Sequence, residues 1–299
     1  MNMRRFLLIS HLKIHNANAM SSPYSIGFPA MTAWLGAMHA LQRHLHQQGL
    51  NEIELNAVAV SCHQFDLKVY KGPGDFVHSI VGTANPLDKD GSRPAFVEEA
   101  RCHLEVSLWV EFHGLDSDDH DRFKNLVDTQ LQRMKWASGD VLTVKPVEIL
   151  QIDEDNEHET RKALNRLMLG YVLIERRDLM LKTMQEENKD ALDALLDHLK
   201  IMHRSTQDEN GKVTWSSRRK IPGWLVPIAV GFQGISELGI ARNQRDRDTL
   251  HRFAESVVTL GEFKMPYRIT KLDDMLWQYR VVPEQNLYLC QTLSSTYGD

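Results

Sequence analysis

The sequence predicts an α+β fold, and three observations support this prediction. Several segments alternate hydrophobic and polar residues with a period of two, which is typical of strands with one wet face. Other segments repeat hydrophobic residues at helical spacing. The chain of 299 residues is 42% hydrophobic and 25% charged, which is ordinary for a globular protein. We therefore expect a large hydrophobic core in one large domain or two smaller ones.

The first expected element is a strand over residues 5–15. Phe6, Leu8, Leu12 and Ile14 occupy one phase of its alternation, and the other phase includes His11, Lys13 and His15. Successive side chains of a strand point to opposite faces. We therefore expect these four side chains on one buried face of a sheet.

A helix is expected over residues 30–48. Trp34, Met38, Leu41 and Leu45 recur at the spacing of an amphipathic helix, and polar residues lie off this stripe. This helix should cover one face of the sheet with these four side chains.

Two strands, a second helix and a further strand follow in the N-terminal half. They are expected at residues 53–70, 102–112, 119–135 and 141–150. The resulting order, strand-helix-strand-strand-helix-strand, is the ferredoxin-like plan that RNA-recognition-motif domains share. A fold plan of this kind does not define a function by itself.

Residues 71–100 break the alternation, because turn and loop residues dominate them. We interpret this segment as a projecting hairpin or arm, with an ordinary surface loop as the alternative. Loops of this length in a compact domain are usually functional or disordered.

The second half is less regular, and we expect it to be mainly helical. We divide the chain into a core of residues 1–150 and a part of residues 151–299, a helical insertion with a smaller α+β portion packed on that core. The expected helices are at 160–169, 178–203, 247–260 and 272–277, and the expected short strands are at 171–174, 222–228 and 287–290.

Charge is distributed unevenly along the chain. The net charge of −5 argues against a free-standing, non-specific nucleic-acid binder. However, the first fifty-one residues contain no Asp or Glu. A basic face on an acidic protein would allow RNA to bind at that face and proteins elsewhere.

Cysteine usage and hydropathy predict a cytoplasmic protein. The three cysteines are far apart and form no Cys-x-x-Cys motif, which suits a reducing compartment. No hydrophobic run approaches the ~18 residues that a membrane span requires. We expect no membrane association.

The loop between the first strand and the first helix is a candidate phosphate site. Asn16, Asn18, Ser21 and Ser22 lie in it, and Pro29 suits the first turn of the helix. Free N–H groups at a helix start can bind an anion. Ordinary turn chemistry is the alternative explanation for these residue types.

Histidines and aspartates offer two other chemistries. His11, His15 and His63 are candidates for a general base in RNA cleavage, although their spacing identifies no partner. Asp118, Asp119 and Asp121 could hold a divalent cation, but residues of this type also cap a helix start. Because capping accounts for these aspartates, we expect no metal. Nucleotide-binding glycine loops are absent from the sequence, so we expect no cofactor.

An ordered series of motifs resembles one family over most of the chain, with residues 115–215 the least similar part. The matching segments are Asn16-Ala17-Asn18-Ala19, Ser21-Ser22-Pro23, Gly27-Phe28-Pro29, His39-Ala40-Leu41-Gln42-Arg43, Asn85-Pro86-Leu87, Asp90-Gly91-Ser92, Val97-Glu98-Glu99, Arg101, His103-Leu104-Glu105-Val106-Ser107-Leu108, Pro222-Gly223-Trp224-Leu225-Val226-Pro227, Arg242-Asn243 and Arg245-Asp246-Arg247. The chain resembles the Cas five-type subunit family of the type I-F CRISPR surveillance complex, also called the Csy complex or Cascade.

This resemblance implies a repeat-associated (RAMP) protein with an RNA-recognition-like core and a thumb, which would be the arm at 71–100. It implies binding to the 5′ handle of the CRISPR RNA. It also implies contact with the large Cas eight-type subunit (the first Csy protein) and with the backbone Cas seven-type subunit (the third Csy protein). Target DNA would be read by pairing with the guide, and no catalysis by this subunit is implied.

We hypothesise RNA contacts by amide, hydroxyl and guanidinium groups of the matching motifs. The first-rank contacts are Asn16, Asn18, Ser21, Arg43, Arg93 and Arg101, and the second-rank contacts are Arg218, Arg219, Arg242 and Arg245. The alternatives are a metal-independent endoribonuclease that processes repeat RNA and, as the weakest, a metal-dependent hydrolase. For the arginines near residues 218 and 242, a solvated turn remains an equal alternative.

Overall fold

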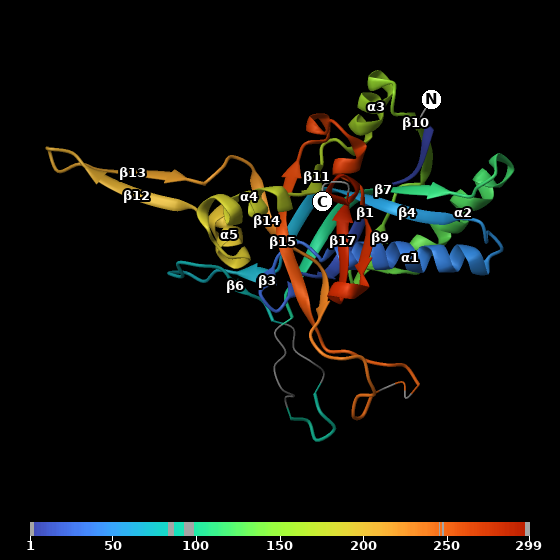
Figure 1. Ribbon diagram of the computed structural model, residues 1–299, viewed down its shortest axis with the longest axis horizontal. Coiled ribbons are helices and arrows are strands. Elements are labelled where there is room, and N and C mark those ends of the chain that lie inside the picture. The colour runs from blue at the N-terminus through green and yellow to red at the C-terminus, as the bar shows by residue number, and fades with distance from the viewer. Residues whose placement is uncertain (1–2, 83–86, 93–98, 245, 247, 297–299) are drawn as a thin grey trace.

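A computed structural model describes residues 3–82, 87–92, 99–244, 246 and 248–296 of the chain. The architecture is mixed α/β, with a large antiparallel sheet and helices packed against it (Figure 1). This confirms an α+β fold.

Eleven of the described strands form the large sheet. They are β1 (Met3–Asn18), β4 (Glu54–Leu67), β7 (Arg101–His113), β8 (Lys135–Trp136), β9 (Gly139–Thr143), β10 (Glu148–Asp153), β11 (Tyr171–Glu175), β14 (Trp224–Gly234), β15 (Ala254–Lys264), β16 (Trp277–Val282) and β17 (Leu287–Thr292). Three separate two-stranded pairs join β2 (Met20–Ser22) to β3 (Ser25–Ile26), β5 (Val69–Tyr70) to β6 (Ser79–Ile80), and β12 (Met202–Gln207) to β13 (Val213–Arg218).

The helices fall into two classes. The α-helices are α1 (Met31–Gln47), α2 (His120–Leu131), α3 (Glu157–Leu164), α4 (Arg177–Glu187), α5 (Ala191–Leu199) and α6 (Leu293–Thr296). Short 3₁₀ turns are η1 (Ser117–Asp119), η2 (Asn165–Leu167), η3 (Pro266–Arg268), η4 (Leu272–Asp274) and η5 (Pro283–Gln285). No helix in the described ranges is both long and apolar enough to cross a membrane.

Strand β1 is the centre of the N-terminal half. It pairs antiparallel with β7, β9 and β10, and β7 pairs with β4. One face of these strands packs on α1 and α2, where the predicted stripe of Trp34, Met38, Leu41 and Leu45 is buried in the main core. This confirms the first helix and the face that it presents.

Two β-bulges in β1 overturn the predicted single hydrophobic face. The register with β7 shifts between Ile9 and Leu12, and again between Ile14 and Ala17. Each bulge adds one residue and so reverses the side-chain phase. Leu12 and Ile14 therefore lie in the main core, whereas Phe6 and Leu8 lie in a second core cluster on the opposite face.

The second half contains more strand than the sequence indicated. The predicted helix at 247–260 is wrong, because residues 254–264 form β15 between β14 and β11. Its β-branched Val257, Val258 and Thr259 fit a pleated sheet. Gly261 fits because an added Cβ would lie 3.0 Å from the Leu173 side chain.

Two other predicted elements differ from the observed ones for local reasons. The predicted helix at 178–203 is interrupted at Asn188, which has a left-handed φ of 51° and separates α4 from α5. The predicted strand at 141–150 is two strands, β9 and β10, with Pro146 between them. Proline has no backbone N–H to donate to a neighbouring strand, so Pro146 separates the two strands.

Six strands close a ring by their pairings. β11 pairs with β15 and β4, and the series β15-β14-β17-β16 returns to β4. Trp277 of β16 lies opposite Val58 of β4, is completely buried, and donates its indole N–H to the Leu173 carbonyl at 2.9 Å. The side chain of Trp277 therefore fills the ring at the point where β16 meets β4.

Within the arm at 71–100, residues 71–82 and 87–92 are mostly exposed, whereas Ala100 is buried. β5 and β6 form a two-residue ladder, and Phe76 near its tip is 96% exposed. Residues 83–86 and 93–98 lie outside the described residues. The role of this segment as a thumb, and the division of the chain at residue 150, stay predictions.

We expect Trp277→Ala to lower the free energy of unfolding by about 3–5 kcal/mol, because it leaves a cavity inside the ring. The matched control is Trp215→Ala, which removes an indole that is 70% exposed and should change stability by less than about 0.5 kcal/mol. Urea midpoints at constant m-value measure both changes. Equal losses in the two variants would contradict the ring packing.

Candidate nucleic-acid interface

The two bulges of β1 place polar residues on the open face of the sheet. We call the residues that meet there the histidine strip: His11, Lys13, His15 and Asn16 of β1, His63 of β4, Lys68 just after it, and Arg101, His103, Glu105 and Ser107 of β7. The strip continues the face that carries Phe6 and Leu8, beyond the point where the second core cluster covers them.

The first bulge is centred on His11, whose φ is 51°. A bulge leaves a backbone donor without a ladder partner, and the His11 N–H donates instead to the Ser107 hydroxyl at 3.1 Å. The same hydroxyl lies 2.7 Å from Nε2 of His63. The rings of His11 and His63 stack with centroids 4.6 Å apart, and Nδ1 of His11 lies 2.6 Å from Glu105.

The second bulge repeats this arrangement at Asn16, whose φ is 57°. Its N–H donates to Nδ1 of His103 at 3.3 Å, and the rings of His15 and His103 stack with centroids 4.4 Å apart. The Lys68 ammonium group donates to the Asn16 amide oxygen. Arg101 donates to the Asn16 carbonyl at 3.4 Å.

The surroundings of His63 and His103 favour their neutral imidazoles at neutral pH. Burial, and then the neighbouring His11, lowers the pKa of His63. Burial, and then His15 and Lys68, lowers the pKa of His103. In addition, His103 can accept the Asn16 N–H only while its Nδ1 carries no proton. The hydrogen bond from His11 lowers the pKa of Glu105, which keeps that carboxylate charged.

The structure brings some of the predicted contacts together. Asn16, Asn18 and Arg101 meet where β1 ends beside the start of β7. Asn18 and Met20 exchange two hydrogen bonds of 3.1 Å, and the Ser21 hydroxyl lies 3.2 Å from that of Ser25.

Other predicted contacts lie elsewhere. Arg43 is exposed on α1 beside His39, which contacts Tyr279 of β16, and β4 and β7 separate β16 from β1 in the sheet. Arg218 and Arg219 belong to the β12–β13 hairpin and its base, and Arg242 is exposed in the loop between β14 and β15. Arg93 and Arg245 lie outside the described residues.

Local bonds in the loop before α1 favour the turn interpretation over a phosphate site at the helix start. The Ser22 hydroxyl accepts the Tyr24 N–H at 3.1 Å and lies 2.7 Å from the Ser25 hydroxyl. Helix α1 begins after Ala30 without a side-chain cap. The serines therefore serve their own turn, and the polar chemistry of this region lies on the strip.

Sequence reasoning missed the grouping of the strip. His103, Glu105 and Ser107 form the polar phase of the 102–112 alternation, so this phase was a visible signal for an outer face. Lys68 lies just after β4, and no comparable pattern in the sequence indicated that it belongs to this face. The bulges that turn His11 and Asn16 towards these residues depend on strand pairing, which the sequence pattern does not give.

The aspartates near the start of α2 form a weaker candidate site, because their side chains pair with neighbouring cations. Asp121 pairs with Lys124 at 2.7 Å, and Asp119 lies 3.5 Å from Arg122. Among the described residues, no group of three or more His, Cys, Asp or Glu side chains is arranged to hold a metal ion.

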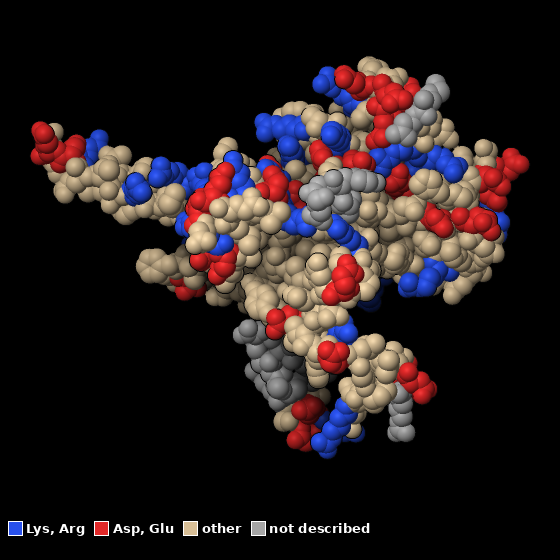
Figure 2. Space-filling view, in the orientation of Figure 1, with Lys and Arg blue, Asp and Glu red and all other residues tan. Residues whose placement is uncertain are grey.

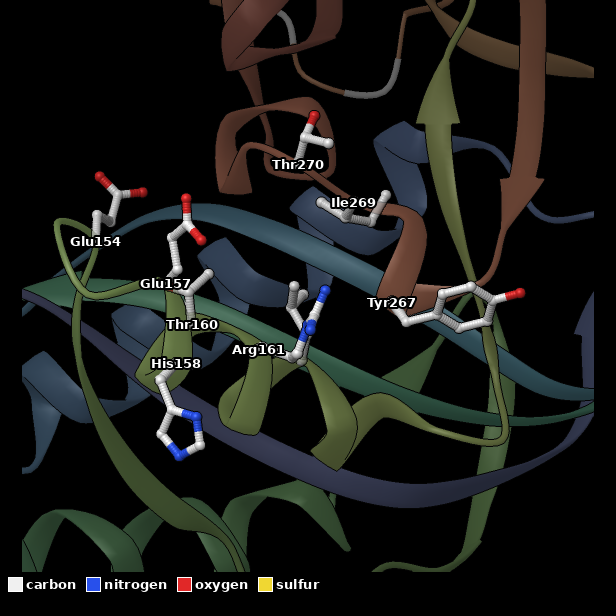
Figure 3. Close-up of a pocket in the computed structure, with 9 residues that line it drawn as sticks. Glu154, Glu157, His158, Thr160, Arg161, Tyr267, Ile269 and Thr270 are labelled. Atoms are coloured by element: carbon white, nitrogen blue, oxygen red, sulfur yellow. The ribbon is translucent and has the colours of Figure 1, made fainter.

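A surface pocket of about 480 Å³ lies between α3 and η3 (Figure 3). Glu154, Glu157, Arg161 and Tyr267 line it. His158 points away from the two glutamates (Figure 3), and Glu154 accepts a hydrogen bond from Arg4 at 2.8 Å. These side chains do not converge on one point, so the pocket is a weaker candidate than the strip.

Comparison with known proteins decides the family. The profile of the family described as CRISPR-associated protein (Cas_Csy2) matches residues 7–290. The chain is also 38% identical, over an alignment of 313 residues, to a protein of Pseudomonas aeruginosa (strain UCBPP-PA14) named CRISPR-associated protein Csy2. The alignment covers 96% of this chain and 94% of that relative. This chain belongs to the Csy2 family.

Membership of the Csy2 family confirms the resemblance that the sequence motifs indicated. The profile spans β1 to β17, so it includes every strand that contributes to the histidine strip and to the closed ring. The fold and the strip are thus features of the part of the chain that the family shares.

We expect acid to destabilise the protein partly through the strip. The unfolded histidines bind protons near pH 6.5, whereas folded His63 and His103 bind them only at lower pH. Lowering the pH from 7.5 to 5.5 therefore favours the unfolded state. The pKa of Glu105 is lowered from 4.5, so its contribution is lost only at still lower pH.

The double variant His63→Gln/His103→Gln should lose less stability than the parent over this pH range, because its side chains cannot take up protons. Glutamine keeps an acceptor for the Asn16 N–H. Urea unfolding at the two pH values measures the difference. Identical pH dependence in parent and variant would contradict the neutral state of these imidazoles.

Proposed function

We propose that the chain is a non-catalytic RNA-binding subunit of a type I-F CRISPR effector complex and that the histidine strip holds the 5′ handle of the CRISPR RNA. The observation that carries this proposal is the strip itself. It gathers stacked imidazoles, an amide, and basic side chains on an open sheet face. Its β1 residues come from the segment without Asp or Glu.

The arrangement of the core supports this placement. The strand order β10-β1-β7-β4, with α1 and α2 on one face, supports our proposal that the core follows the ferredoxin-like plan of RNA-recognition domains. In those domains the sheet face opposite the helices stacks RNA bases. The histidine strip occupies the open part of the corresponding face here.

The chemistry of the strip suits single-stranded RNA. Imidazole rings offer flat surfaces for unstacked bases. Lys13, Lys68 and Arg101 are the Lys and Arg residues of the strip, suited to phosphate oxygens. Glu105 limits the charge but binds His11 and Lys13, so it also fixes their positions. Such a site would combine phosphate attraction with base stacking.

In the proposed complex, other surfaces meet protein. The large Cas eight-type subunit and the backbone Cas seven-type subunit would cover parts of the acidic remainder, with the arm at 71–100 as the thumb. Target DNA would pair with the guide and not be read by this chain. The cytoplasm is the expected compartment.

We expect Asn16→Gly/Asn18→Ala to weaken binding of a handle RNA roughly thirtyfold, since two lost hydrogen bonds of about 1 kcal/mol each amount to about 2 kcal/mol. Glycine is chosen at residue 16 because it accepts the positive φ. The measurement is a mobility-shift titration with the co-purified large subunit, at a low and a high salt concentration.

The matched control is Asn125→Ala, which removes an exposed amide from α2. It should bind and assemble like the parent. Parental affinity and assembly in the Asn16→Gly/Asn18→Ala variant would overturn the assignment of these two residues.

One observation favours a second candidate function, a metal-independent endoribonuclease. The histidines that looked scattered in the sequence form stacked pairs, and His11 and His63 converge on Ser107 and Glu105. Two imidazoles could act as general base and general acid. We retain the scaffold proposal, because the lowered pKa of His63 disfavours the protonated form that a general acid at this position needs.

Incubation of labelled repeat RNA with the chain distinguishes the two functions. The scaffold predicts uncut RNA with the parent and with His11→Asn/His63→Gln, where asparagine tolerates the left-handed backbone of residue 11. Cleavage by the parent that the double variant loses 100-fold or more, as expected for removal of acid–base groups at ~10²–10⁴ each, would establish the enzyme instead.

A further inference from the structure

The β12–β13 hairpin projects from the body of the protein (Figure 1). It makes no strand pairing with the large sheet in the described structure, and all but one of its twelve strand residues are exposed. A lone two-stranded hairpin is at best marginally stable in water. An arm of this kind contributes little to the core, so its surface chemistry indicates what it contacts.

One face of the hairpin is polar and basic. The facing pairs on it are Met202 with Arg218, Arg204 with Ser216, and Thr206 with Thr214. Facing and diagonal side chains of an antiparallel pair lie within about 4.5–8 Å of one another. The two arginines are diagonal neighbours, and Arg219 follows directly at the hairpin base.

These three arginines have free guanidinium groups, whereas nearby lysines do not. No ion pair of Arg204, Arg218 or Arg219 occurs within the described ranges. By contrast, Lys189, Lys200 and Lys220 beside the hairpin base are bound by Glu187 and Asp197. Figure 2 shows basic residues along the arm and acidic residues at its tip. The stem therefore presents uncompensated positive charge.

The opposite face carries an exposed aromatic ring. Trp215 is 70% exposed and faces Ser205, and the next pair towards the base is His203 with Ser217, whose side chains lie 2.8 Å apart. Trp215 precedes Arg218 by three residues. A two-stranded ribbon twists strongly, so a ligand that follows the open edge of β13 can contact both the ring and the guanidinium groups.

We propose that the β12–β13 hairpin binds an unpaired DNA strand, with Trp215 stacking on a base and Arg204, Arg218 and Arg219 contacting phosphates. Exposed aromatics beside a cationic groove are the elements of sequence-tolerant single-strand binding. Free guanidinium groups match phosphate geometry. A single nucleic-acid strand would use the arginines and the flat, exposed ring together.

The choice of DNA rests on the proposed function, which assigns the RNA to the histidine strip. The hairpin belongs to a separate sheet, so its ligand need not be the strand that the strip holds. We predicted Arg218 and Arg219 from the sequence as second-rank RNA contacts. The present proposal assigns these two arginines to the DNA strand instead.

The test is fluorescence anisotropy with the whole chain. The probes are a labelled poly-thymidine DNA, a poly-uridine RNA of equal length and the handle RNA, each longer than a site of about 4–16 nucleotides. Arg204→Ala/Arg218→Ala/Arg219→Ala should weaken DNA binding at least tenfold. The slope of log affinity against log salt should fall by about 2 for three lost phosphate contacts.

Trp215→Ala should weaken DNA binding about fivefold to hundredfold without changing the salt slope, and Trp215→Phe should restore most of it. Both hairpin variants should bind the handle RNA like the parent. The charge-matched control is Arg133→Ala/Lys162→Ala/Lys271→Ala, three exposed cations outside the hairpin, which should leave DNA affinity within about twofold of the parent's.

Parental DNA affinity in both hairpin variants would overturn the proposal. An equal loss of handle-RNA binding in those variants would also overturn it, because the hairpin would then belong to the RNA site. If the parent binds the DNA but not the handle RNA, the proposed function fails while the hairpin result still stands. The two ideas are thus judged by different probes.

Discussion

The backbone N–H groups that the bulges of β1 leave unpaired are the constraint on which the outer face of the sheet depends. A buried or half-buried donor without a partner is costly, so each bulge requires an acceptor from β7. Ser107 serves the bulge at His11, and His103 serves the bulge at Asn16. The positions of the stacked imidazoles follow from this requirement. In this way a structural need of the central strand arranges the side chains that we assign to RNA binding.

The strip and the hairpin represent two ways of binding nucleic acid on an acidic protein. The strip uses polar groups that are already bonded to one another, so its geometry is fixed before a ligand arrives. The hairpin keeps its guanidinium groups free on an exposed ribbon, where their positions are less constrained. The strip therefore favours a nucleic acid in one bound conformation, whereas the hairpin can accept strands of many nucleotide sequences. Neither arrangement requires a net positive charge, because each depends on local charge.

The sequence predicted local features better than long-range ones. Helix α1 was predicted with its correct buried face, because its periodicity is uninterrupted. The single hydrophobic face of β1 was wrong because bulges depend on the partner strand. β15 was assigned as helix because its sheet environment, between β14 and β11, is not visible locally. At the candidate site, Asn16, Asn18 and Arg101 were predicted, but Lys68 and the partners of the histidines required the pairing of β1, β4 and β7.

The closed ring of strands also has consequences for the order in which the chain is synthesised. β4 emerges early, yet the strands that cover its free edge, β11 and β16, follow more than a hundred residues later. Until then, a nascent chain exposes an unpaired edge of the kind that recruits strands from other chains. Domains of this size are vulnerable to aggregation at that stage. Strands β11 and β16 therefore protect the free edge of β4 once they are synthesised. A truncated chain that ends before residue 277 would lack β16 and would be prone to self-association.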